Sequence, residues 1–278
     1  MKTSDAELKT RLAHAGWDDH RLRGRSLFKE VLGDNTAFWD LWSFSLGGPG
    51  LNETDRRVLD AMATCYTAAD PRIPPLKLIR ILSSYGSVMA AIAGGLAYQE
   101  NAQIGIWPVD AASSDLIDIH RTVRKQTSST SHSDEKVKQA IREVLGKWAA
   151  KRRRPAGFGV PARPSDERVK ALRKRMEALN RDNGRYWLLA HHVEEILARK
   201  RPIPLNIAGA CGAACLDMGF TPRQIGVFAI AFAIHAFAGN AFEGSEDTVE
   251  ILQKLPDSFI LYTGPKDRIS PRANREGS

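Results

Sequence analysis

The chain has 278 residues, of which 43% are hydrophobic and 26% are charged, and its formal net charge is +8 at pH 7. This composition is that of an ordinary globular protein with a sizeable core, arranged as one large domain or two smaller ones. The positive charge permits an anionic partner, such as a nucleic acid, a membrane surface or a phosphorylated small molecule, but it does not choose among them.

The sequence favours a cytoplasmic protein. Residues 1–9 lack an apolar core and do not form a secretory signal peptide. The most apolar run, residues 225–242, is interrupted by His235, Gly239 and Asn240, so no membrane span and no membrane partner are predicted.

The cysteine content predicts buried thiols and no metal site. Cys65, Cys211 and Cys215 are odd in number and lie among apolar and alanine residues. Although two of them are four residues apart, no other Cys or His lies at metal-ligand spacing.

In the N-terminal half, helical patterns dominate. Residues 5–15 have a polar helix-like pattern, and a glycine-terminated helix is predicted over 37–46 with Phe38, Leu41, Trp42 and Leu46 facing the core. Further helices are predicted from the cap at Asn52 to about residue 69, over 76–83 and over 87–98, where Gly94 and Gly95 allow tight helix contact.

In the C-terminal half, periodicity is lost over residues 101–112 and in the Ser/Thr-rich loop 127–133. Helices are predicted over 114–125, 134–150, 167–180 and 186–200. Because no sustained alternation of β-branched residues occurs, we expect an all-α fold.

A run of four cations, residues 151–154, ends the helix predicted over 134–150. Such a run is typical of a solvated helix end, and an anion site is the alternative. Since few aromatic residues accompany it, the run does not favour a nucleic-acid partner.

Residues 201–222 are the densest run of small side chains in the chain, bounded by prolines at both ends. Glycine, alanine and cysteine in this number predict that another backbone or a ligand lies very close to the segment.

Several motifs, taken in order, resemble the citrate synthase-like superfamily and within it the short citryl-CoA lyases. The matching segments are Arg23-Gly-Arg-Ser-Leu27, Leu59-Asp-Ala61, residues 90–96, Gly157-Phe-Gly159 with Pro161, Asp166 and Arg168, Pro204-Leu-Asn206, Leu216-Asp-Met-Gly-Phe220, residues 228–231 and Tyr262-Thr-Gly-Pro265. The resemblance implies an all-α homodimer that binds a coenzyme A (CoA) thioester as its substrate. It also implies a large helical domain, residues 1–110 with 200–278, and a small domain, residues 111–199, that contributes the CoA-binding loop.

The resemblance further assigns residues to the ligand. Gly157, Phe158, Gly159, Arg163 and Arg168 match the segment that holds the nucleotide end of CoA.

The expected reaction removes a proton next to a thioester carbonyl, and it needs a base and two hydrogen-bond donors. The base position of the resembling motif carries Ala208, in Asn206-Ile-Ala-Gly209, and one histidine position carries Val160. The second histidine position carries Asp110, and the position of a carboxylate-binding arginine carries Phe232. Losing one preorganised donor alone costs on the order of 100- to 1000-fold in rate, so citrate chemistry is not expected.

Two hypotheses follow. In the first, the site is rebuilt: Asp110, in an apolar pocket of Trp107, Val160 and Phe232 near Asn206 and Ala208, acts as an acid or base, and His235 supplies an imidazole. The chain would then form or cleave a carbon–carbon bond of a CoA thioester, with a substrate less acidic than citrate. In the second, the chain is an inactive homologue that binds a CoA-like ligand or serves as a regulatory or partner subunit. The sequence leaves the roles of His191 and His192 open.

Overall fold

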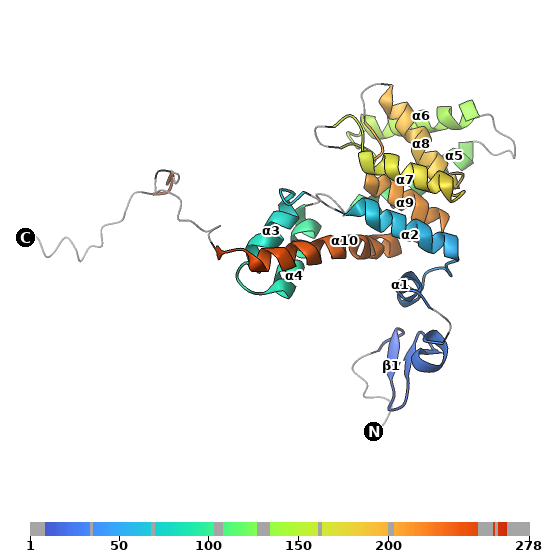
Figure 1. The fold of residues 1–278 in the computed structure, drawn as a ribbon. Coiled ribbons are helices and arrows are strands. Elements are labelled where there is room, and N and C mark those ends of the chain that lie inside the picture. Colours follow the sequence, from blue (N-terminus) through green and yellow to red (C-terminus); the bar gives the residue numbers. More distant parts are fainter. Residues whose placement is uncertain are drawn as a thin grey trace, which may run out of the picture.

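The computed structural model describes residues 9–33, 36–67, 70–102, 108–126, 134–160, 163–199, 203–249, 258 and 261–265. As predicted, the chain is mainly helical (Figure 1). Within the described ranges the α-helices are α1 (Phe38–Leu46), α2 (Glu53–Tyr66), α3 (Pro74–Ser83), α4 (Val88–Ala102), α5 (Pro108–Gln126), α6 (Asp134–Ala150), α7 (Glu167–Ala178), α8 (Arg185–Ala198), α9 (Ile207–Asp217) and α10 (Pro222–Glu246).

A small antiparallel sheet near the N-terminus corrects the helix-like pattern predicted over residues 5–15. Its strands, in the order β1-β2-β3, are β1 (Ala13–Ala15), β2 (His20–Leu22) and β3 (Arg25–Ser26), so residues 13–15 are not helical. Arg23 and Gly24, with φ of 48° and 85°, form the two-residue turn between β2 and β3. Strands of two or three residues are too short to show an alternating pattern, which is why the sequence does not reveal them. A π-helical turn, η2 (Leu27–Val31), follows.

Helix α1 buries only part of the predicted face: Trp42 and Leu46 pack half-buried against the core as predicted, but two other positions differ. Trp39 and Ser43 are buried, whereas Phe38 is 56% exposed and Leu41 is 37% exposed. The indole Nε1 of Trp39 donates to Asp60 Oδ1 at 2.7 Å, which fixes this face of α1 against α2. Apolar residues occur all around α1, so their spacing alone does not select the buried side.

The predicted loop over 101–112 is wrong at both ends, because α4 continues to Ala102 and α5 begins at Pro108. Proline suits the first position of a helix, where its fixed φ fits and no N–H is required. The tight contact predicted at Gly94 and Gly95 is confirmed: a Cβ on Gly94 would lie 2.7 Å from Leu82 Cδ1 of α3, and one on Gly95 would meet Ile79.

Helices α9 and α10 lie at the centre of the helical fold (Figure 1). Every residue of α9 from Ile207 to Leu216 is buried, mainly against α5 and α8. Along α10, Gly226 faces Asp110 of α5 and Gly244 faces Arg80 of α3, so α10 connects two helical groups. The division into residues 1–110 with 200–278 and residues 111–199 stays a prediction.

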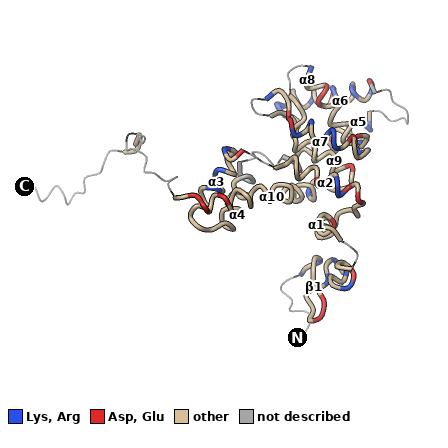
Figure 2. Tube along the Cα trace, viewed as in Figure 1, with Lys and Arg blue, Asp and Glu red and all other residues tan. Residues whose placement is uncertain are grey.

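The length and composition of α10 would also suit a membrane span, with a mean hydropathy of 1.8. Half of its most apolar stretch is buried inside the protein, as in the core helix of a soluble protein. One such helix is weak support for membrane insertion. Its middle carries no Lys, Arg, Asp or Glu (Figure 2).

Candidate functional site

The Gly157–Val160 turn pairs with the segment that leads into α9. The N–H of Asn206 donates to Gly157 O at 3.0 Å, and the N–H of Gly159 donates to Pro204 O at 2.7 Å. Gly157 and Gly159 have φ of 84° and 93°, a conformation that favours glycine. The structure therefore brings together two segments that are far apart in the sequence.

Asn206 joins this turn to α9 through its side chain. Its amide oxygen accepts from Gly209 N–H at 3.0 Å and caps α9, while its amide nitrogen donates to Gly159 O at 3.1 Å. Asn206 was predicted to line a substrate pocket, but both ends of its amide already serve the fold. Ala208, in the first turn of α9, is only 2% exposed.

The close backbone approach predicted for the small-residue segment is confirmed at α9. A Cβ on Gly157 would lie 2.7 Å from Gly209 Cα, and a Cβ on Gly209 would meet the carbonyl oxygen of Gly157. On the neighbouring turn, a Cβ on Gly212 would lie 2.7 Å from Ser113 Oγ of α5. A neighbouring backbone, rather than a ligand, occupies the space that these glycines leave.

Asp166 connects α7 with α9. Its carboxylate accepts from Arg168 Nε and Nη2 at 2.9 and 2.8 Å, from the N–H of Arg168 at 3.1 Å and from the N–H of Ile207 at 3.0 Å. Burial opposes ionisation of this carboxyl, but the hydrogen bonds from Arg168 outweigh it and hold the pKa of Asp166 below its ordinary value. A carboxylate with four hydrogen bonds is a structural anchor and not a free base.

Arg168 and Arg163, predicted to bind CoA, both have acidic partners in the chain. Arg163 Nη1 lies 2.6 Å from Glu167 Oε1 on the surface. Arg168 is bound to Asp166, yet its side chain is 38% exposed, and its Nη1 has no hydrogen bond to the described residues. Each guanidinium thus retains N–H groups that a phosphate could approach from solvent.

The C-terminal turn of α2 lies beside Arg168 and was not predicted as part of the site. Tyr66 is 2% exposed, and burial raises its pKa well above 10, while the charge of Arg168 opposes that shift. Burial likewise raises the pKa of Cys65, again opposed by Arg168. Thr67 Oγ1 lies 2.6 Å from His235 Nε2 of α10. The helical spacing from Met62 to Tyr66 is the sequence signal that could have identified this buried phenol.

The structure does not bring Asp110 and His235 together. Asp110 lies exposed in the first turn of α5 and faces Gly226 of α10, where an added Cβ would be 3.2 Å from its own Cβ. His235 lies nine residues after Gly226 in α10. Nine residues advance a helix by about 13.5 Å and two and a half turns, so His235 projects from the opposite side of α10. The apolar pocket predicted around Asp110 stays a prediction, since Trp107 lies outside the described residues.

Phe232 is a core residue. It has no exposed surface and packs at centroid distances of 5.5 to 6.0 Å against Trp39, Tyr66 and Phe228. In this conformation the side chain has no accessible surface with which to contact a ligand, so its role in lining a substrate pocket stays a prediction. Val160, in contrast, is partly exposed at the end of the turn.

The three thiols are unsuited to nucleophilic catalysis. Burial raises the pKa of Cys65 and raises that of Cys211 well above 9, and it raises the pKa of Cys215 to about 12. They are therefore protonated near neutral pH. In the ranges that the structure describes, no group of three His, Cys, Asp or Glu side chains could hold a metal ion.

His191, whose role the sequence left open, belongs to a network that supports the site. Its Nδ1 lies 2.9 Å from Arg173 Nη2 and 3.4 Å from Glu194 Oε2. The other oxygen of Glu194 accepts from Leu205 N–H at 2.8 Å, directly before Asn206. Glu194, which is itself held by Arg173 and His191, thus fixes the segment that leads into α9.

The run 151–154 is mainly exposed, as expected of a solvated helix end. Arg153, although exposed, forms an ion pair with Asp115 of α5 and lies 3.8 Å above the Trp148 ring.

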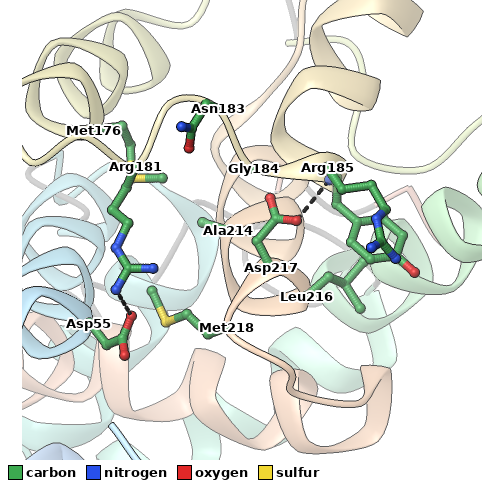
Figure 3. Close-up of a pocket in the computed structure, with 11 residues that line it drawn as sticks. Asp55, Met176, Arg181, Asn183, Gly184, Arg185, Ala214, Leu216, Asp217 and Met218 are labelled. Atoms are coloured by element: carbon green, nitrogen blue, oxygen red, sulfur yellow. Dashed lines mark hydrogen bonds and ion pairs between the residues drawn. The ribbon is translucent and has the colours of Figure 1, made fainter. Parts of the chain in front are cut away.

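A polar cavity of about 330 Å³ lies at the opposite end of α9 (Figure 3). Arg181 Nη2 lies 2.7 Å from Asp55 Oδ1 at one side, and Asp217 accepts from the N–H groups of Tyr186 and Trp187 at the other. Asp217 thereby caps α8, and burial raises its pKa.

No protein-family model matches the sequence, and no curated protein matches it significantly. Solved structures do share its fold. A citryl-CoA lyase from Hydrogenobacter thermophilus superposes with a TM-score of 0.75 at 21% identity, covering 97% of this chain and 99% of that one. An ATP citrate lyase from Methanosaeta concilii gives 0.67 at 17% identity, covering 97% of this chain and 43% of that one. The citrate synthase from Thermotoga maritima MSB8 gives 0.57 at 17% identity, covering 83% and 58%. The chain therefore has a citrate synthase-like, all-α fold.

Proposed function

We propose that this protein binds a CoA thioester, or a closely related acyl carrier molecule, beside the Gly157–Val160 turn, and that it does not catalyse citrate chemistry. The observation that carries the CoA proposal is a fold similar to that of a citryl-CoA lyase over nearly the whole of both chains. The absence of citrate chemistry is proposed because Val160 ends the turn and Ala208 lies in the first turn of α9, where an acid–base residue would be needed. The Methanosaeta concilii structure contains (3S)-citryl-CoA, which supports this ligand class.

The protein's own groups favour binding over turnover. Asp166 is fully hydrogen-bonded, the thiols are protonated, and Asp110 lies far from His235 along α10. Valine and alanine can neither donate a hydrogen bond to an enolate oxygen nor accept a proton. We therefore favour a ligand-binding, regulatory or partner subunit over an enzyme.

A calorimetric titration with CoA and acetyl-CoA tests the proposal. Arg163→Gln should weaken binding roughly 10-fold, because it removes one charge-assisted contact to phosphate. It should leave stability nearly unchanged, since an exposed ion pair contributes about 0 to 1 kcal/mol. Arg175→Gln, an exposed arginine in the last turn of α7, is the matched control and should bind like the wild type. No heat and no thermal shift with either ligand at millimolar concentration would remove the proposal.

A divergent enzyme is the second candidate, and the pair of Thr67 with the exposed His235 favours it. An imidazole oriented by a hydroxyl at the end of α2 could act as a base. Exchange of acetyl-CoA α-protons in heavy water distinguishes the two candidates. Exchange that is present in the wild type and lost in His235→Gln would establish an enzyme; no exchange, together with CoA binding, supports the binding subunit.

We also propose a homodimer formed through α3, α4 and the end of α10. This group lies apart from α5–α8 (Figure 1) and exposes several large apolar side chains. The exposed residues are Leu82, Tyr85, Met89, Phe242 and Val249. Apolar surface gathered at one end of a molecule is typical of a protein interface.

A further inference from the structure

A second cavity, of about 470 Å³, lies between the last turns of α5 and the first turn of α8. Four cations line it, Arg121, Arg124 and Lys125 from α5 and Arg185 from α8, together with the rings of His120 and Tyr186. None of the described residues that line it is acidic. Lys and Arg also occur on all four helices from α5 to α8 (Figure 2), but here they converge on one hollow.

Three of these cations, Arg124, Lys125 and Arg185, form no ion pair with a described carboxylate, whereas Arg121 pairs with Asp118 at 3.4 Å. Asp217 is a second nearby counter-charge, since its charge interacts with that of Arg185. Elsewhere on α7 and α8 the pattern differs, since Arg168 and Arg173 each pair with an acid. Four converging cations with so few counter-charges repel one another, and an anion in the hollow would reduce that cost.

The rings of His120 and Tyr186 pack against each other in the wall of the hollow. Their centroids lie 5.2 Å apart. Burial lowers the pKa of His120, and the charges of Arg185 and Arg124 lower it further, so the imidazole experiences the positive field of the hollow. Arg185 and Tyr186 also line the polar cavity of Figure 3, so the two cavities meet at this first turn of α8.

We propose that this hollow binds a small polyanion with an oligophosphate group, either free or as part of a nucleotide. Guanidinium groups bind phosphate oxygens in a bidentate manner, and three arginines and one lysine suit several adjacent negative charges. A cavity of this size matches small-molecule sites. The site is separate from the proposed CoA site, because Asp217 and Asn206 mark opposite ends of α9, about 16 Å apart.

The test is an NMR titration of the intact protein with pyrophosphate, tripolyphosphate and ATP at constant ionic strength, following the His120 ring. The expected result is saturable binding accompanied by a rise in the His120 pKa. Arg124→Gln/Arg185→Gln should reduce the affinity by about 10- to 100-fold, because two charge-assisted contacts are lost. Both side chains are exposed, so this variant should fold.

The control variant is Lys174→Gln/Arg175→Gln, which removes two exposed positive charges from α7. If it weakens binding as much as the first variant, or if no ligand shifts His120, the proposal is wrong. Tighter binding of duplex DNA than of every small ligand, lost in the first variant, would also overturn it. Equal affinity for tripolyphosphate and ATP identifies the phosphate chain as the recognised group, whereas tighter ATP binding identifies a nucleotide. This test is independent of the CoA proposal: if Arg163→Gln does not weaken CoA binding, the polyanion result still stands.

Discussion

At the beginning of α9, the absence of a Cβ atom on glycine decides how closely the neighbouring segments pack. Gly157 and Gly209 touch backbone to backbone, whereas Gly212 faces the Ser113 hydroxyl of α5. A methyl group at Gly157 or Gly209 would have to displace main chain, which cannot move without shifting α9 or the turn against it. Glycine is thus required here by contact as well as by conformation.

Gly209→Ala is predicted to destabilise the protein by about 2 to 3 kcal/mol, because its Cβ would collide with the carbonyl oxygen of Gly157. Urea unfolding followed by circular dichroism measures this. Gly146→Ala on α6, where an added Cβ meets nothing within 4 Å, is the control. That change should raise stability by up to about 1 kcal/mol. Equal effects of the two variants would contradict the packing described here.

Because of Asp166, the free energy of unfolding should fall as the pH becomes acidic. Because its folded-state pKa is lowered from 3.8, its contribution is fully present above the unfolded-state pKa and is lost as the pH falls through the folded-state value. Asp166→Asn should cost about 2 to 3 kcal/mol at neutral pH, and the difference from wild type should shrink below about pH 4.

Unfolding curves at neutral and acid pH test this prediction. Glu167→Gln, which alters the exposed neighbour, should change stability by less than about 0.5 kcal/mol at any pH. A difference between Asp166→Asn and wild type that stays constant down to about pH 3 would show that Asp166 does not act through its charge.

At the scale of elements, helices are joined end to end by the carboxylates of a buried residue, Asp166, and of a more exposed one, Asp217. Asp166 holds the beginnings of α7 and α9, and Asp217, the last residue of α9, holds the beginning of α8 (Figure 3). Helix N-termini attract negative charge, and each carboxylate satisfies N–H groups that have no partner within their own helix. The two proposed ligand sites therefore lie at opposite ends of α9.

Asp217→Ala is predicted to loosen the first turn of α8. Gly184, its N-cap residue, has no side chain to replace the lost carboxylate, so the cost should be about 1 to 2 kcal/mol. Hydrogen exchange should speed up at the amides of Tyr186 and Trp187. The control, Asp118→Ala, removes a partly exposed carboxylate from α5 and should leave those amides unchanged. Unchanged protection in Asp217→Ala would contradict the capping role.

At the scale of the whole molecule, α10 connects the α5–α9 group with α3 and α4 (Figure 1). The three-helix end that it forms with α3 and α4 is small and leaves apolar side chains exposed, among them Met89 at 77% and Phe242 at 65%. A second copy of the chain that covers this end would complete its burial.

The wild type is therefore predicted to have twice the chain mass of 30.7 kDa in light scattering, and Met89→Glu is predicted to have the mass of one chain. Burying a carboxylate in an apolar interface is costly, which is the reason for the expected dissociation. Leu188→Glu, at another exposed apolar residue, is the control and should remain dimeric. A monomeric wild type, or dissociation by both variants alike, would contradict the predicted interface.

The sequence by itself determined the helical class, most helix positions and the cap at Asn52, because helical periodicity and capping depend on neighbouring residues. It also predicted that another backbone or a ligand lies close to the Gly- and Ala-rich segment, and the structure shows a backbone there. The sequence did not reveal the short strands, the buried face of α1 or the beginning of α5.

Only the tertiary structure decided what the candidate site contains. Asp110 and His235 were both plausible acid–base residues, but they face different sides of α10, and Phe232 lies in the core. Conversely, the end of α2 lies close to two other helices: the charge of Arg168 of α7 acts on Tyr66, and Thr67 contacts His235 of α10. Local sequence sets which side of a helix is apolar; which helix covers that side, and at what height, depends on the packing of the whole chain.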